Sequence, residues 1–156
     1  MNFGRHLLVD GSNILHAWPE LRSLAAKDRN AARAQLLQRL TAIHDNENVR
    51  VTVVFDGRGD QLVIEHPFDQ PTFSVIHTSS GLTADDVIEQ MVANAAQPAM
   101  CVVATDDRAE RQTTAASGAD VLRSEDLAAW VMRAEARQGA VLEARRATNT
   151  RAWKKP

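Results

Sequence analysis

Short apolar runs alternate with longer helical patterns along most of this chain, and this order constrains the fold more than any other feature. The strand-like runs are His6–Val9, Val49–Phe55, Phe73–Thr78, Met100–Ala104 and Asp120–Leu122. Near-continuous apolar strands separated by helices are typical of a parallel sheet that is covered on both faces and joined by right-handed crossovers. The sequence therefore predicts an α/β fold, a three-layer α/β/α sandwich with a mainly parallel central sheet.

The length of 156 residues fits one hydrophobic core. We expect a single domain over residues 1–138, followed by a basic C-terminal helix or tail over residues 139–156. The segment from Asp56 to Thr72 contains two glycines and two prolines. It is predicted to be a mobile loop with one short strand at Leu62–Ile64.

The composition excludes several classes of protein. No apolar run approaches the roughly 18 residues of a membrane-spanning helix, and the first residues lack an apolar signal segment. Cys101 is the single cysteine, so no internal disulfide can form. These features predict a cytoplasmic protein without a membrane partner, in which Cys101 is an inert core thiol.

Charge is unevenly distributed along the chain. The net charge is −2, whereas residues 133–156 contain seven basic and two acidic residues. Arginine outnumbers lysine fifteen to three, which suits phosphate recognition because a guanidinium group binds phosphate oxygens in pairs. The base composition of the genome would explain the same bias equally well.

Acidic residues follow three of the predicted strands. Asp10, Asp56 and Asp106 each lie where a strand ends, and Asp85 lies at the start of the helix after the third strand. Ligands of open α/β sheets bind beyond the carboxyl ends of the strands, so we expect these four carboxylates to converge there. Converging carboxylates repel one another unless a cation neutralises them, and hard oxygen ligands favour Mg²⁺ or Mn²⁺.

Each of these residues also has a structural interpretation. Asp and Asn commonly cap helices and shape turns, and this would account for Asp10, Asn13, Asp56 or Asp106 taken singly. Capping does not require repeated placement at one edge of a sheet. The joint pattern therefore favours a metal site that hydrolyses phosphodiester bonds, since such a metal polarises a phosphate and activates water.

Helical geometry separates the two adjacent aspartates of the segment that begins at Thr83. Asp85 borders the apolar stripe and can face the sheet edge, whereas Asp86 lies three residues after Thr83, the spacing of a capping box. We expect Asp85 to be a ligand and Asp86 a cap. Glu89 follows Asp85 by four residues and is either part of the site or a solvated helix flank.

Two arginines are candidates for phosphate binding. Arg33 falls within an apolar helix face, where its charge needs a partner: the acidic cluster, a substrate phosphate, or solvent reached along the rim of the core. Arg108 follows Asp106 closely and could hold a phosphate or form a surface ion pair. No Walker loop, Rossmann glycine pattern, histidine metal spacing or Ser-His-Asp set can be assembled.

Several motifs, in this order, resemble a YacP-like NYN domain from about Arg5 to Met132. They are Leu8-Val9-Asp10-Gly11-Ser12-Asn13-Ile14, Trp18-Pro19-Glu20-Leu21, Ala32-Arg33, Val53-Val54-Phe55-Asp56, Thr83-Ala84-Asp85-Asp86-Val87-Ile88-Glu89 and Thr105-Asp106-Asp107-Arg108. The resemblance implies a PIN-like fold and a Mg²⁺- or Mn²⁺-dependent endoribonuclease that acts on RNA, free or within a larger ribonucleoprotein.

The resemblance also implies roles for individual residues. The catalytic and metal-binding residues would be Asp10, Asp56, Asp85 and Asp106, supported by Asn13. We add Ser12, Arg33, Asp86, Glu89, Thr105 and Arg108 as candidate supporting or substrate-binding residues. Ser12 stands where the family often has tyrosine, which weakens the case for a contact to a base or ribose.

Three alternatives remain open: a non-catalytic RNA-binding NYN module, a metal-dependent adhesion-type module that begins at Asp10-Gly11-Ser12, and a nuclease acting on DNA flaps. Against the last two, Ile14 replaces the final serine of the adhesion motif, and the chain has no room for a flap nuclease's DNA-gripping elements.

Overall fold

Five parallel strands form the sheet that the sequence predicted, and a sixth strand pairs antiparallel at one edge. The computed structural model describes residues 4–154, and side chains for residues 4–148. The strands are β1 (Arg5–Asp10), β2 (Val49–Gly59), β3 (Val63–Glu65), β4 (Phe73–Ser79), β5 (Cys101–Ala104) and β6 (Asp120–Leu122). Their order in the sheet is β3-β4-β2-β1-β5-β6, with β3 antiparallel to β4.

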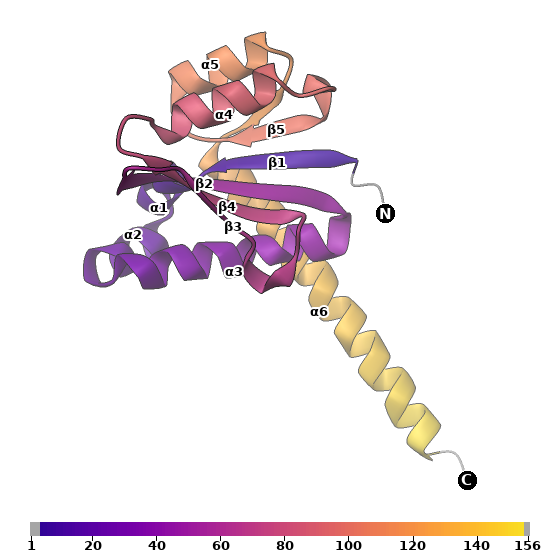
Figure 1. Ribbon diagram of the computed structural model, residues 1–156. Helices are drawn as coiled ribbons and strands as arrows, with labels where there is room; N and C mark the ends of the chain where they lie inside the picture. Colours follow the sequence, from indigo (N-terminus) through magenta and orange to yellow (C-terminus); the bar gives the residue numbers. More distant parts are fainter. Residues whose placement is uncertain (1–3, 155–156) are drawn as a thin grey trace.

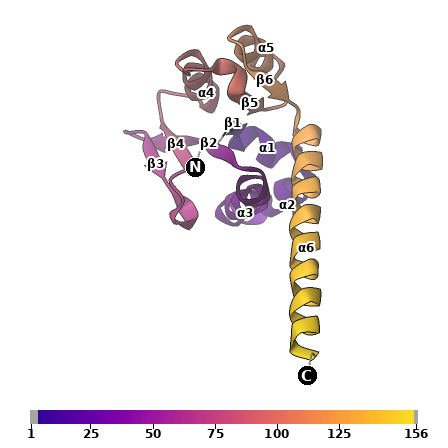
Figure 2. The same ribbon diagram turned by 90° about the vertical axis from the view of Figure 1, so that its right-hand side faces the viewer.

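Six α-helices and two short 3₁₀ segments connect these strands. The helices are α1 (Gly11–Ala17), α2 (Pro19–Lys27), α3 (Arg29–Glu47), α4 (Ala84–Ala93), α5 (Arg108–Ala116) and α6 (Ser124–Lys154), and the 3₁₀ segments are η1 (Pro67–Asp69) and η2 (Pro98–Met100). Figures 1 and 2 show α4 and α5 on one face of the sheet and α1, α2 and α3 on the other. The predicted α/β/α sandwich is therefore confirmed.

Alternate residues of the central strands supply the two cores. Leu7 and Val9 of β1 pack into the core under α1, α2, α3 and α6, whereas Leu8 packs into the core under α4. Successive side chains of a strand point to opposite faces, and the apolar runs in the sequence reflect burial on both sides. Cys101 is buried in the second core, and burial raises the pKa of its thiol.

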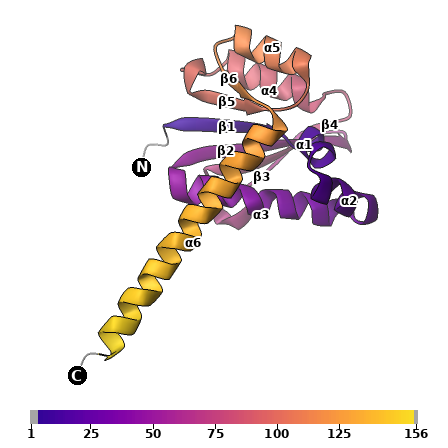
Figure 3. The same ribbon diagram turned by 180° about the vertical axis from the view of Figure 1, so that it is seen from behind.

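Helix α6 begins against the body of the domain and continues beyond it (Figures 1 and 3). Leu127, Trp130 and Val131 are buried, whereas Val141 and Leu142 are exposed. The predicted boundary between residues 138 and 139 falls inside this helix, and the division into two regions stays a prediction. The basic side chains of Arg151, Lys154 and Lys155 lie outside the described side chains.

The prediction of a loop from Asp56 to Thr72 is partly wrong. Strand β2 continues to Gly59 and pairs with Ser79 of β4 after an irregularity that follows Phe55. The short strand predicted within this segment is present as β3, shifted by one residue.

No helix in the described part of the chain is both long and apolar enough to cross a membrane.

Candidate metal centre

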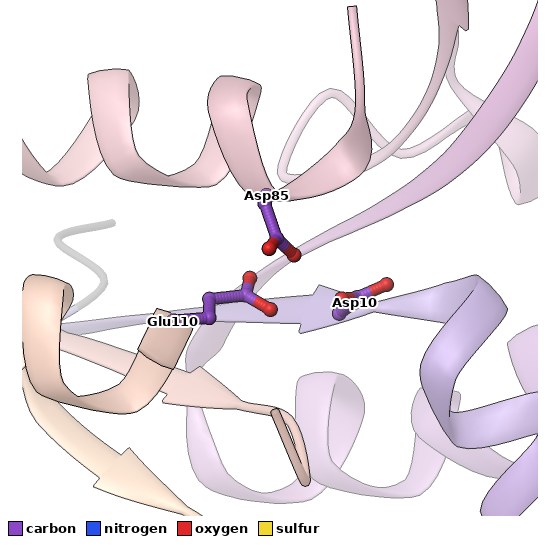
Figure 4. A group of neighbouring side chains, drawn as sticks. All are labelled: Asp10, Asp85 and Glu110. Atoms are coloured by element: carbon purple, nitrogen blue, oxygen red, sulfur yellow. The ribbon is translucent and has the colours of Figure 1, made fainter. Parts of the chain in front are cut away.

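Three carboxylates from three different elements meet at the carboxyl end of β1. Asp10 of β1, Asp85 of α4 and Glu110 of α5 each offer one oxygen, and these oxygens lie within 4.8 Å of one another. Figure 4 shows the three side chains as neighbours, with the carboxylates of Asp85 and Glu110 facing one another. Two of these residues were predicted from the sequence, and Glu110 was not.

Asp10 is the last residue of β1 and also the N-cap of α1. Its carboxylate accepts a hydrogen bond of 3.3 Å from the backbone N–H of Asn13, which fixes its orientation. The pKa of Asp10 is raised to about 6. Burial is the largest cause, hydrogen bonds to Glu110 and the Asn13 backbone oppose it, and the Asp85 charge adds to it. Asp10 is thus a buried acid held beside other acids.

Glu110 is fully buried in the first turn of α5. Within the described part of the chain, neither of its carboxylate oxygens accepts a hydrogen bond from a donor group. Its close polar neighbours are the carboxyl groups of Asp10 and Asp85, and burial and these neighbours raise the pKa of Glu110 to about 10. A buried carboxyl group without donors is costly, so this side chain needs either a proton or a cation.

The loop before α5 holds Glu110 in this position. Asp107 caps the helix, and its carboxylate accepts hydrogen bonds from the N–H groups of Ala109, at 2.9 Å, and Glu110, at 3.3 Å. The backbone N–H of Asp107 donates to the Thr105 hydroxyl at 3.1 Å. Thr105 is itself fully buried. Thr105 and Asp107 therefore set the direction from which Glu110 approaches the other two acids.

The start of α4 separates the roles of its two aspartates, as helical geometry predicted. Thr83 and Asp86 form a reciprocal capping box, with hydrogen bonds of 3.1 and 3.2 Å. Asp85 belongs to the three-carboxylate group. Glu89 lies one turn further on, where burial and then Asp85, Asp86 and Asp107 raise its pKa.

Asp56 lies outside the three-carboxylate group, and its polar groups are hydrogen-bonded to neighbouring elements. Its carboxylate accepts a hydrogen bond of 2.8 Å from the backbone N–H of Ala84, the first residue of α4. Its own N–H donates to the Ser12 hydroxyl at 3.2 Å. Asp56 thereby connects β2 to α1 and α4, and it holds the turn that carries Asp85.

Asp106 also lies outside the group. Its two carboxylate oxygens accept hydrogen bonds from the backbone N–H and the hydroxyl of Ser124, both at 2.7 Å. Its N–H donates to the side-chain oxygen of Asn13 at 2.8 Å. The sequence predicted both Asp56 and Asp106 as metal ligands. The structure shows both carboxylates hydrogen-bonded to the first residue of a helix, and their role as ligands stays a prediction.

The two predicted phosphate-binding arginines differ in burial. The Arg33 guanidinium carbon lies 5.0 Å from the centre of the Phe55 ring, and burial, followed by the charge of Arg29, lowers the Arg33 pKa. Arg108 is exposed at the first residue of α5. Arg33 therefore lies against the core rim, and Arg108 is open to solvent.

Comparisons with known proteins identify relatives of this chain. The model of the YacP-like NYN domain matches residues 7–155. YacP from Bacillus subtilis (strain 168) is 38% identical over 87 residues, which cover 54% of this chain and 49% of that protein. The matched part thus spans about half the length of this relative.

Solved structures extend the likeness to nearly the whole chain. The crystal structure of Rae1 (YacP) from Bacillus subtilis is similar with a TM-score of 0.75 and 29% identity, covering 97% of this chain and 86% of that one. A tryptophan-to-leucine variant of the same protein gives a TM-score of 0.70 and 30% identity, with coverage of 97% and 85%. The likeness includes the sheet and the helices that carry the three carboxylates.

Proposed function

Because the chain belongs to the YacP-like NYN domain family, we propose that it is a metal-dependent endoribonuclease that hydrolyses phosphodiester bonds within RNA. The family is PIN-like and of nuclease type. One observation carries the proposal: Asp10, Asp85 and Glu110 bring carboxylate oxygens within 4.8 Å of one another. The Glu110 oxygens are buried and accept no hydrogen bond from a described donor.

These residues fit a divalent metal ion. Crowded carboxylates are stabilised by a cation, and an all-oxygen ligand set favours Mg²⁺ or Mn²⁺. Asp10, Asp85 and Glu110 would hold the ion. When bound, such an ion polarises the scissile phosphate and lowers the pKa of a water molecule.

The chain contributes orientation to this chemistry. The Asn13 N–H fixes the Asp10 carboxylate, and the Asp107 cap fixes the turn that carries Glu110. The Asp56 carboxylate holds the first residue of α4, next to Asp85. Carboxylates supported by neighbouring hydrogen bonds keep their geometry. We propose that the exposed Arg108 contacts the RNA backbone beside the centre.

A nuclease assay tests the proposal. The purified protein, incubated with Mn²⁺ or Mg²⁺ and with RNA blocked at both ends, should cut internally, and EDTA should stop cleavage. Asp10→Asn should reduce the rate by about a hundredfold or more, because a ligand and an oriented carboxylate are lost. Asp120→Asn is the matched control, since this exposed residue lies at the amino end of β6 and pairs only with Arg5 among the described residues. Cleavage by Asp10→Asn at the rate of Asp120→Asn would refute the proposal.

A non-catalytic RNA-binding module is the second candidate. Exposed basic residues lie along α6, including Arg133, Arg145 and Arg146, and such residues bind phosphates without catalysis. RNA binding with no metal-dependent cleavage of any structured or unstructured RNA would favour this function. In either case the proposed partner is RNA, free or within a larger ribonucleoprotein, and the proposed location is the cytoplasm.

The adhesion-type alternative is disfavoured by the surroundings of α1. Ile14, at the position of the motif's last serine, is fully buried in the core. The Ser12 hydroxyl accepts a hydrogen bond from Asp56. Ile14 has no hydroxyl group to offer, and the Ser12 hydroxyl is already hydrogen-bonded within the chain.

A further inference from the structure

A cavity of about 240 Å³ lies beside the metal centre, at the carboxyl end of β2. Its charged and polar lining includes His16 of α1, Arg29 and Arg33 of α3, and Asp56 and Arg58 of β2. We call this the arginine cavity. The metal centre is acidic, whereas this cavity contains three arginines and one aspartate.

The three arginines of this cavity have no carboxylate partner within ion-pair distance among the described residues. Among the described arginines, Arg5, Arg39 and Arg137 are the ones within ion-pair distance of a carboxylate. What sets Arg29, Arg33 and Arg58 apart from the other unpaired arginines is that they line one cavity. The charge of Arg29 lowers the pKa of Arg33 and the charge of Asp56 raises it, so one carboxylate offsets part of the repulsion among three guanidinium groups. A bound anion would relieve the rest. The cavity therefore has the charge of an anion site within an otherwise acidic protein.

Arg33 is held in a geometry that leaves a donor unused. Its guanidinium carbon lies 5.0 Å from the centre of the Phe55 ring, and Phe55 is only 1% exposed. The Nε atom of Arg33 is buried and donates to no described acceptor. A phosphate oxygen accepts strong, charge-assisted hydrogen bonds from guanidinium donors. A phosphate in the cavity would therefore complement the part of the Arg33 side chain that lines it.

The arginine cavity and the metal centre share two segments of the chain. Asp56 lines the cavity, and its carboxylate accepts from Ala84, the residue before Asp85. Ser12 also lines the cavity, two residues after Asp10, and its hydroxyl accepts from the Asp56 N–H. A nucleic-acid strand that reaches the three carboxylates would therefore pass next to the cavity.

We infer that the arginine cavity binds a phosphate group of the RNA whose scissile phosphate lies at the metal centre, with Arg33, Arg29 and Arg58 as its donors. This inference rests on the proposed function, because it takes RNA as the ligand. The phosphate is either an internal backbone phosphate or a 5′-terminal phosphate. Both offer the same oxygens to the three arginines.

RNA binding without cleavage tests the inference separately from catalysis. Fluorescent single-stranded RNA is titrated with the full chain in EDTA, at several salt concentrations. Arg33→Ala and Arg58→Ala should each weaken binding by about tenfold, and each should reduce the slope of log K against log salt by about 0.7 per lost phosphate contact. Arg58 is exposed, so the result does not depend on Arg33→Ala folding normally.

Arg50→Ala is the matched control. Arg50 is exposed near the amino end of β2, whereas the arginine cavity lies at the carboxyl end of the same strand. If Arg58→Ala binds as tightly as Arg50→Ala, the inference is overturned, even when the wild-type protein cleaves RNA. If the wild-type protein never cleaves RNA but Arg58→Ala still loses affinity, the phosphate site stands and the proposed catalysis fails.

Parallel titrations with 5′-hydroxyl and 5′-phosphate RNA identify which phosphate is bound. If Arg58→Ala loses affinity for both RNAs, the site binds an internal phosphate. If it loses affinity for the 5′-phosphate form alone, the site binds the terminal phosphate.

Discussion

Asp106 and Ser124 are joined by two hydrogen bonds of 2.7 Å, one from the Ser124 backbone N–H and one from its hydroxyl. The carboxylate therefore holds the first residue of α6 against the loop after β5. The same serine accepts a hydrogen bond of 2.9 Å from the Trp18 indole at its carbonyl oxygen. Ser124 thus connects α6 to both the loop after β5 and Trp18, which lies between α1 and α2.

Asp106→Asn should lower the free energy of unfolding by about 1–2 kcal/mol, because a helix-capping carboxylate and its charge-assisted hydrogen bonds are weakened. Urea denaturation measures this change. Ser124→Ala should cost less, since it removes only the hydroxyl donor. The two substitutions share one interaction, so the double variant should lose less than the sum of the two single losses.

The same variant distinguishes a cap from a metal ligand. If Asp106 serves as a cap, Mn²⁺ should still raise the melting temperature of Asp106→Asn by as much as it raises that of the wild-type protein. Loss of the Mn²⁺ effect without loss of stability would instead support the role that the sequence predicted for Asp106.

Glu110→Gln should raise the melting temperature of the metal-free protein by several degrees at pH 8. The substitution removes a buried carboxyl group that accepts no described hydrogen bond and that lies against Asp10 and Asp85. Mn²⁺ at a large excess should stabilise the wild-type protein by up to about 3 kcal/mol, because it binds the native state. Most of this stabilisation, together with RNA cleavage, should be lost in Glu110→Gln.

Differential scanning fluorimetry with and without Mn²⁺ measures both effects. Glu143→Gln is the control, since this residue is exposed on α6 and makes no described ion pair. A metal-free Glu110→Gln protein that melts below the wild-type protein would argue against crowding among the three carboxylates.

The sheet could be predicted because burial on both faces leaves apolar runs in the sequence. Asp10 and Asp85 could be predicted for a similar reason, since strand ends and helical periodicity fix their positions on the backbone. The directions of Asp56 and Asp106 could not. Asp106 follows the end of β5 closely, and Asp56 follows the irregularity within β2. Each carboxylate accepts from the first residue of a helix distant in sequence, Ala84 or Ser124. Such pairings depend on how the helices pack.

Glu110 was missed for another reason. It lies three residues after Asp107, and an acid in the first helical turn is ordinarily explained by capping or by the helix dipole. The sequence held one weak signal, because Glu110 and Thr114 are four residues apart and therefore share one helix face. The structure shows that both side chains are fully buried. Only the packing of α5 on the sheet distinguishes a buried acid from an exposed cap.

Gly57→Ala should reduce the free energy of unfolding by about 2 kcal/mol or more, because a Cβ atom there would collide with the carbonyl oxygen of Thr78, a backbone atom that cannot turn aside. The substitution would also strain the hydrogen bond from the Gly57 N–H to the Thr78 hydroxyl.

Gly139→Ala should instead increase the free energy of unfolding. A Cβ atom there meets nothing within 4 Å, and alanine favours a helix over glycine by roughly 1 kcal/mol. Urea denaturation of both variants measures the difference, and equal stabilities would contradict the close approach of β2 and β4 at Gly57.

His6 should make the protein less stable in mild acid. Burial, followed by the charge of Arg50, lowers the pKa of His6 to about 4, and its Nε2 atom lies 2.7 Å from the Thr52 hydroxyl. The unfolded chain binds a proton near pH 6.5, whereas the folded chain resists protonation until about pH 4. The stabilisation is therefore complete above pH 6.5 and is lost as the pH falls from 6.5 to 4, by an amount on the order of 2–3 kcal/mol.

Free energies of unfolding measured at pH 7.5, 6, 5 and 4 should fall more steeply for the wild-type protein than for His6→Gln, which retains a polar side chain near Thr52 but cannot bind a proton. His16→Gln replaces an exposed histidine and should keep the wild-type pH dependence, so the same slope in all three proteins would exclude His6 as the source.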